Sequence, residues 1–172
     1  MNFSIARIIR HLWSPRHELS CSWLLWQRLV TKLSERGRHA TRESGAFLLG
    51  TRADGRAHIV DFVLYDDLDP HALDTGIVRF DGRYFGELWD ICKRRSLSVV
   101  ADVHVHPGGS YQSASDRNHP MISKAGHIAL ILPDFAKHPV RIEAIGIYRY
   151  LGAKNWHAVA PAARRAFLHI GV

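Results

Sequence analysis

Two of the 12 histidines stand two residues apart near the end of an apolar stretch, in the sequence ADVHVHPGG that begins at Ala101. In a β-strand, side chains at positions i and i+2 point to the same face, so His104 and His106 project together. Sites in α/β proteins tend to lie at the carboxyl ends of strands. Two neutral imidazoles on one face suit zinc, and a catalytic zinc needs a third protein ligand and an open position for water. Histidines without such neighbours, such as His127, are interpreted as surface or satisfied side chains.

The third ligand should be an acidic residue that can reach the two imidazoles. Asp116 is the natural candidate, because it follows a loop that contains Gly108 and Gly109 and can fold back. His119 and Asp102 are rival ligands. Asp102 shares the histidine face by alternation. It is therefore a candidate acceptor that fixes an imidazole tautomer, or simply a polar strand residue.

The stretch HVHPGGSYQSASD resembles the H-x-H-P…S-x-x-D signature of the JAB/JAMM metalloproteases, also called MPN domains. That family also carries a glutamate on an early strand, seven residues before a glycine, and the sequence ESGAFLLG places Glu43 and Gly50 at that spacing. Five residues separate Pro107 from Ser113, where the family usually has six, while the Ser-x-x-Asp spacing is intact. The resemblance covers roughly residues 18–160.

The resemblance implies a role for each matched residue. His104, His106 and Asp116 would bind Zn²⁺, with water as the fourth ligand. Glu43 would accept a proton from that water and later donate one to the leaving amine, and Ser113 would help to stabilise the tetrahedral oxyanion. Without the resemblance, Glu43 would be interpreted as an exposed residue at the start of a strand. Ser113 would be interpreted as a turn or helix-capping residue, and both of its roles could hold together.

The elements that must position these residues are a mixture of strands and helices. A helix is expected over residues 22–37, with Ser22 as its cap and Gly37 at its end. A hairpin is expected to turn at Asp54-Gly55. The remaining expected strands cover 18–22, 43–52, 56–65, 77–80, 97–106, 127–135, 140–151 and 155–160, and the remaining helices cover 81–95 and 161–170. This order predicts an α/β (α+β) fold with a single central mixed β-sheet flanked by helices. The resemblance implies a JAB/JAMM-like, cytidine-deaminase-like architecture.

The length of 172 residues predicts one domain, over residues 18–172, after an N-terminal extension over residues 1–17. Two distant cysteines, Cys21 and Cys92, argue against a disulfide framework. The start is too charged for a secretory signal and no apolar run reaches 18 residues. We therefore expect a cytoplasmic protein without a membrane partner. A zinc deaminase is not expected, because the chain lacks the C-x-x-C motif of that class.

The resemblance to the JAB/JAMM family implies a zinc-dependent isopeptidase or peptidase that cleaves after the C-terminal tail of a ubiquitin-like protein. By the same resemblance, its partners would be that protein and its conjugates, and conjugation enzymes of the same operon in antiphage defence. The segment 74–80 is a candidate edge for β-addition of the tail. The alternatives are a non-catalytic JAB-like binding or scaffold module and a nucleic-acid-associated metal hydrolase. The net charge of +7 favours an anionic partner, but nucleic acid is not expected, because no nucleic-acid-binding motif is present.

Overall fold

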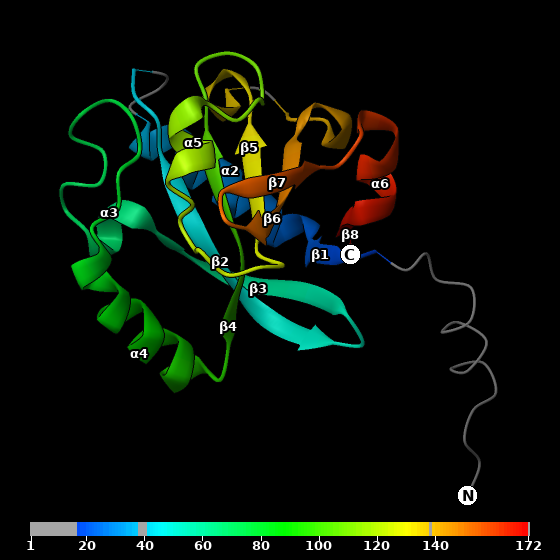
Figure 1. Cartoon of the computed structure of the whole chain (residues 1–172), viewed down its shortest axis with the longest axis horizontal. Coiled ribbons are helices and arrows are strands. Elements are labelled where there is room, and N and C mark those ends of the chain that lie inside the picture. Colours follow the sequence, from blue (N-terminus) through cyan, green and yellow to red (C-terminus); the bar gives the residue numbers. More distant parts are fainter. Residues whose placement is uncertain (1–16, 38–40, 138, 172) are drawn as a thin grey trace, which may run out of the picture.

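The computed structural model describes residues 17–37, 41–137 and 139–171, and their strands form one curled eight-stranded sheet (Figure 1). The strand order is β7-β6-β5-β4-β2-β3-β1-β8. Three neighbouring pairs, β1–β3, β1–β8 and β4–β5, are parallel and the other four are antiparallel. The prediction of a single mixed sheet is therefore confirmed. The strands are β1 (Leu19–Ser22), β2 (Gly45–Ala53), β3 (Arg56–Leu64), β4 (Ser98–Val105), β5 (Ile128–Leu132), β6 (Gly146–Gly152), β7 (Asn155–Ala158) and β8 (Leu168–Gly171).

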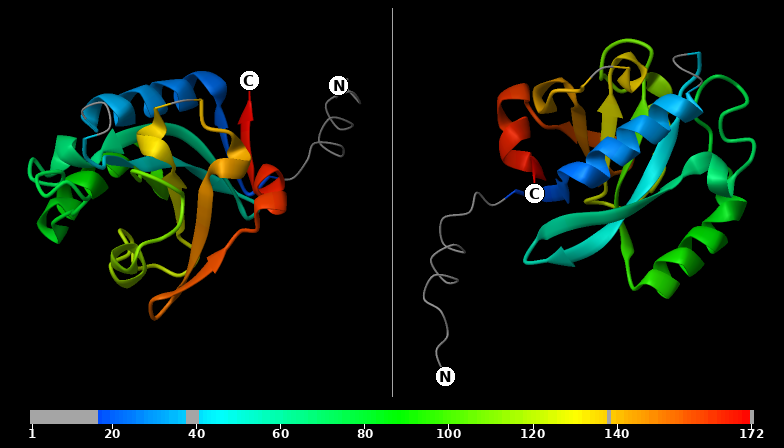
Figure 2. Two further views of the ribbon diagram at one scale, coloured as in Figure 1. Left: turned by 90° about the horizontal axis from the view of Figure 1, so that it is seen from above. Right: turned by 180° about the vertical axis from the view of Figure 1, so that it is seen from behind.

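Helices lie on both faces of this sheet. The longest, α2, crosses one face, as the view from behind shows (Figure 2). The α-helices are α2 (Trp23–Arg36), α3 (Tyr65–Leu68), α4 (Phe85–Arg95), α5 (Ala114–Asn118) and α6 (Arg164–Phe167), and short 3-10 turns cover Gly82–Tyr84, Asp134–Ala136, Ile142–Ala144 and Pro161–Ala163. Within the described ranges, no helix is long and apolar enough to cross a membrane.

The central strand β2 divides the core into two clusters. Leu48 belongs to the cluster that includes Leu29 and Leu33 of α2. Phe47 belongs to the cluster on the other face, which includes Leu88 of α4. Successive strand side chains point to opposite faces, and both faces of β2 are covered. This explains why its first six residues are all buried instead of alternating between core and solvent.

Local sequence signals explain the best-predicted elements. The Ser22 hydroxyl accepts a hydrogen bond from the Leu25 amide and so caps α2, which ends before Gly37. Asp54 and Gly55 both have positive φ, 51° and 75°. Positive φ at both central residues is required by the two-residue turns that match the twist of a hairpin. The Asp54-Gly55 turn joins β2 to β3 as expected.

Three expected elements are wrong. Residues 77–80 form no strand, because their backbone groups bond to the preceding loop and to Glu43 and not to the sheet. The strand expected over 140–151 begins only at Gly146, after a 3-10 turn. The C-terminal helix is short, and residues 168–171 form β8, which pairs with β1. The predicted extension over 1–17 lies outside the described residues except for His17.

Gly50 lies at a β-bulge where β3 approaches β2 closely. A Cβ atom there would lie 2.0 Å from the carbonyl oxygen of His58, which is backbone and cannot rotate away. We expect Gly50→Ala to lower the free energy of unfolding by about 1–3 kcal/mol, as overpacked cores do, measured by chemical denaturation. Gly86→Ala is the control, because a Cβ atom in that helical position meets no atom within 4 Å. Equal stability of both variants would contradict the packing constraint.

Candidate metal centre

His104 lies near the end of the central strand β4, and His106 directly follows that strand. Backbone pairing places His104 between Gly45 of β2 and Ile131 of β5. Both imidazoles are almost fully buried, and the Nε2 atoms of His104 and His106 are 2.9 Å apart. The other ring nitrogen of His104, Nδ1, is buried without a hydrogen-bond partner among the described residues. The polar contacts of this ring are therefore all made at Nε2.

The loop that follows β4 is fixed by backbone contacts with distant parts of the chain. The His106 carbonyl accepts from Phe135 and the Gly108 carbonyl accepts from Asp134. Residues 134–136 all have φ between 52° and 54°, a left-handed conformation that costs non-glycine residues free energy. Further along, the Tyr148 hydroxyl donates to the Ser110 carbonyl (2.8 Å). These contacts hold a loop that leads back over the histidines.

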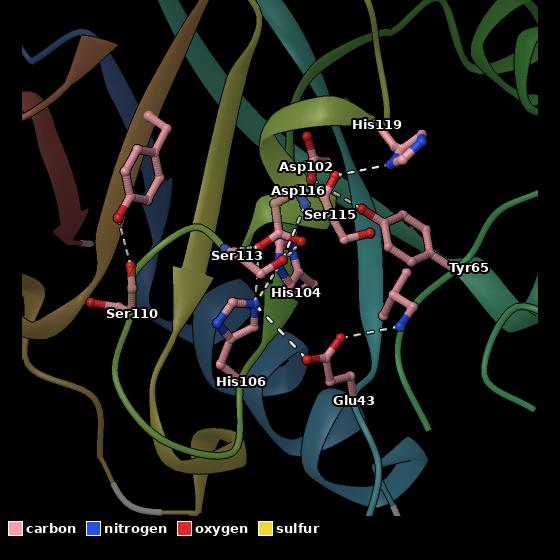
Figure 3. A network of polar contacts seen from close by, with 12 residues as sticks. Glu43, Tyr65, Asp102, His104, His106, Ser110, Ser113, Ser115, Asp116 and His119 are labelled. Carbon is pink, nitrogen blue, oxygen red and sulfur yellow. Dashed lines mark hydrogen bonds and ion pairs between the residues drawn. The ribbon is translucent and has the colours of Figure 1, made fainter. Parts of the chain in front are cut away.

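Asp116 reaches the histidines from helix α5, which lies in front of β4 (Figure 3). Ser113 and Asp116 form a capping box. The Ser113 amide donates to Asp116 Oδ2 (2.6 Å), and the Asp116 amide donates to the Ser113 hydroxyl oxygen (3.1 Å). The same carboxylate lies 3.5 Å from Nε2 of His104 through Oδ1 and 3.3 Å from Nε2 of His106 through Oδ2. The helix cap therefore also orients the acidic side chain toward the imidazoles.

The donor atoms of His104, His106 and Asp116 fit a metal ion. All three offer a ligand atom within 4.8 Å of the others. Zinc bonds of about 2.0–2.1 Å in a tetrahedral arrangement separate neighbouring ligand atoms by roughly 3.3 Å. The separations of 2.9, 3.3 and 3.5 Å in this cluster are close to that value. Two imidazoles and one carboxylate also leave a fourth position, as catalytic sites require.

Electrostatics around the cluster favour a positive charge. Burial alone would raise the pKa of Asp116, but hydrogen bonds from His104 and His106 outweigh it and hold that pKa well below its usual range. Burial alone would lower the pKa of His104, but the neighbouring Asp116 carboxylate outweighs it and raises that pKa above its ordinary value. Because the pKa of His104 is raised, a proton on its imidazole competes with a bound cation.

Glu43 approaches the cluster from the start of β2. Its Oε1 lies 3.9 Å from Nε2 of His106, and its Oε2 accepts a hydrogen bond from the Val78 amide (3.1 Å). The next residue, Ser44, is buried and donates its hydroxyl to the Leu33 carbonyl at the end of α2. One carboxylate oxygen of Glu43 is thus held by backbone, while the other faces the imidazoles.

The two rival ligands do not join the cluster. His119 ends α5 and contacts the Ser115 carbonyl through Nδ1 (3.2 Å). Asp102 is buried, and its oxygens contact the Tyr65 hydroxyl (3.1 Å) and His127 Nε2 (2.5 Å). His127 is accordingly a satisfied side chain and not a surface one. Its pairing with Asp102 was not predicted, because Asp102 lies in β4, His127 directly precedes β5, and no motif connects the two residues.

A groove opens beside the cluster, with His104 and Asp116 in its wall. Its other walls come from the segment before α4 and from the residues that follow α5. They are largely apolar, and include Val78, Phe80, Phe85, Pro120 and Met121. An extended peptide could therefore lie along the groove with apolar side chains against these walls.

Comparison with known proteins finds a partial similarity in sequence and a solved structure with a similar fold. No protein-family model matches the chain. A probable metalloprotease of Sinorhizobium fredii is 32% identical over 69 residues, which are 40% of this chain and 43% of that protein. The chain thus matches less than half the length of this relative. The solution structure of a protein from Desulfitobacterium hafniense shares the fold, with a TM-score of 0.58 and 13% identity over 83% of this chain and 90% of that one.

We expect one metal ion per chain, bound by His104, His106 and Asp116. Two remaining protein ligands are too few to hold the ion tightly. We therefore expect His104→Ala and Asp116→Ala each to lose stoichiometric metal binding. Zinc titration and elemental analysis measure this, with His119→Ala as the control that keeps full binding. Retention of tight, stoichiometric zinc by both ligand variants would exclude this assignment.

Proposed function

We propose that this chain is a zinc-dependent peptidase of the JAB/JAMM type. The observation that carries the proposal is the cluster of His104, His106 and Asp116 with the Glu43 carboxylate beside it. A metal-dependent peptidase fits both this cluster and the similarity to a probable metalloprotease. Zinc is the preferred ion in the proposal, because a set of two imidazoles and one carboxylate with an open position is typical of catalytic zinc.

In this proposal the bound ion, Glu43 and Ser113 each have a distinct catalytic role. A zinc ion bound there would act as a Lewis acid that polarises the scissile carbonyl and makes water more acidic. Glu43 Oε1 accepts the proton of the attacking water and delivers it to the departing amine. Ser113 Oγ accepts from the Asp116 amide, so its own proton remains available to stabilise the developing oxyanion.

The proposed substrate is a ubiquitin-like protein with an extended C-terminal tail. The groove beside the cluster supports this proposal, because an extended tail could lie against its apolar side chains with its end near His104 and Asp116. The segment 74–80 adds no strand to the sheet, so the tail would contact a groove wall and not a ready-made strand edge. Docking of the folded domain outside the groove would supply proximity and specificity. The net charge of +7 suits a partner with an acidic face. The conjugation enzymes of the same operon remain part of this proposal.

We expect Glu43→Gln to bind zinc as the unmodified protein does but to lose most activity. Glutamine keeps the size of the side chain and cannot take the proton, and general acid–base groups contribute about 10² to 10⁴ in rate. Initial rates on a peptide substrate, measured beside zinc affinity, test this. A variant that binds zinc and cleaves at the original rate would show that Glu43 is not the base. Absence of cleavage by the unmodified zinc-loaded protein would favour a binding module instead.

We also expect selective cleavage after the tail of a ubiquitin-like protein. A gel assay compares such a protein, fused through its C-terminus to a reporter, with casein as a generic substrate. The fusion should be cut at a single position, while casein stays intact, because specificity depends on a docked domain. Equal digestion of both, or digestion of casein alone, would reject the isopeptidase proposal while leaving the metal centre in place.

A further inference from the structure

The groove beside the candidate metal centre contains an arginine that the proposed chemistry does not use. Arg79 lines this groove, and its side chain is exposed. The groove walls also contain His104 and Asp116 of the cluster, and His119. A guanidinium stays charged at every physiological pH. Arg79 therefore gives the groove a constant positive charge.

The acidic residues of the same segment do not neutralise this charge. Each aspartate between residues 66 and 81 contacts a group other than Arg79: Arg36 contacts two of them, backbone amides contact one, and His71 and Arg83 contact one each. These residues are Asp66, Asp67, Asp69, Asp74 and Asp81. Arg79 has no ion-pair partner among the described residues. Its guanidinium is thus available to a carboxylate that a ligand brings into the groove.

The backbone is fixed on both sides of Arg79. The Arg79 amide donates to a carbonyl of the preceding loop (2.9 Å). The amide of Val78, one residue earlier, donates to Glu43 Oε2 (3.1 Å). The ring of Phe80, one residue later, packs edge-on against Phe47 of the core, with the ring centroids 5.0 Å apart. The arginine side chain therefore starts from a fixed segment that also holds the proposed base.

We propose that Arg79 selects substrates that carry an acidic residue in the tail near the scissile bond, by pairing with its carboxylate in the groove. The inference rests on the proposed function and makes its substrate more specific. The apolar walls of the groove suit the neighbouring tail residues, while the arginine sets the preferred sign of charge. A tail rich in lysine or arginine is disfavoured, because like charges repel each other in the groove.

Short capped peptides of alanine, serine and valine test the inference. Each peptide carries a single glutamate, glutamine or lysine, which is moved from position to position. Affinities are measured by fluorescence anisotropy with zinc-loaded Glu43→Gln, and kcat/KM is measured with the unmodified zinc-loaded protein. We expect a position at which glutamate binds about 2- to 5-fold more tightly than glutamine, the scale of an exposed ion pair. Lysine should bind more weakly there, and high salt should reduce the difference.

Variants of the arginine assign the preference to its side chain. In the Glu43→Gln background, Arg79→Gln should abolish the preference for glutamate and Arg79→Glu should reverse it in favour of lysine. Arg79→Gln should keep the original zinc affinity, because the metal ligands are unchanged. Arg94→Gln is the matched control, since it removes an exposed arginine from the end of α4 that does not line the groove. It should keep the preference, which separates a local contact from the effect of the net charge.

The possible failures can be told apart. The inference is overturned if no position favours glutamate, including the case in which no peptide binds. It is also overturned if the preference survives Arg79→Gln, because the metal ion or the net charge would then be its source. Cleavage without any charge preference would leave the proposed function in place. If neither the peptides nor the fusion protein are cleaved, the proposed function fails, and the anisotropy values still decide whether Arg79 binds a carboxylate in the groove.

Discussion

The close approach of two buried imidazoles is the constraint on which the site depends. The Nε2 atoms of His104 and His106 are 2.9 Å apart, so two lone pairs cannot face each other there without a cation or a proton between them. The Asp116 carboxylate lies 3.3–3.5 Å from both Nε2 atoms and favours a positive charge between them. The surrounding elements must therefore hold three side chains near one point, while leaving that point open on one side.

The sheet and the loop after β4 meet this requirement by different means. The imidazoles are fixed by the central position of β4, which is paired on both sides. Asp116 is fixed by the capping box of a five-residue helix, which is too short to be stable by itself. Contacts from distant residues hold this helix: Trp156 of β7 donates to the Arg117 carbonyl, and Ser110 packs so tightly on β6 that position 146 has room only for glycine. The C-terminal strands thus take part in building the site.

The features that depend on local sequence signals were predicted correctly. The Ser22 cap, the Asp54-Gly55 turn and the i, i+2 histidines each express a rule that operates within a few residues, and the structure contains each feature. The errors arose where distant pairing decides. Residues 168–170 were predicted as the end of a helix, yet residues 168–171 form β8 because the edge of β1 is available to pair with them. The partnership of Asp102 with Tyr65 and His127 was likewise invisible, because it joins residues from three separate segments.

One packing contact joins the segment of Glu43, the general base of the proposed mechanism, to the buried pair of Tyr65 and Asp102. Gly45 follows Glu43 by two residues, and a Cβ atom there would lie 2.2 Å from the ring of Tyr65. The tyrosine therefore fills the space that a side chain at position 45 would need, while its hydroxyl donates to Asp102. Since Glu43 lies two residues before β2, and Gly45 of β2 pairs with His104 of β4, a shift of Tyr65 would disturb both sides of the site. The position of Glu43 and the buried contact with Asp102 thus depend on the same side chain.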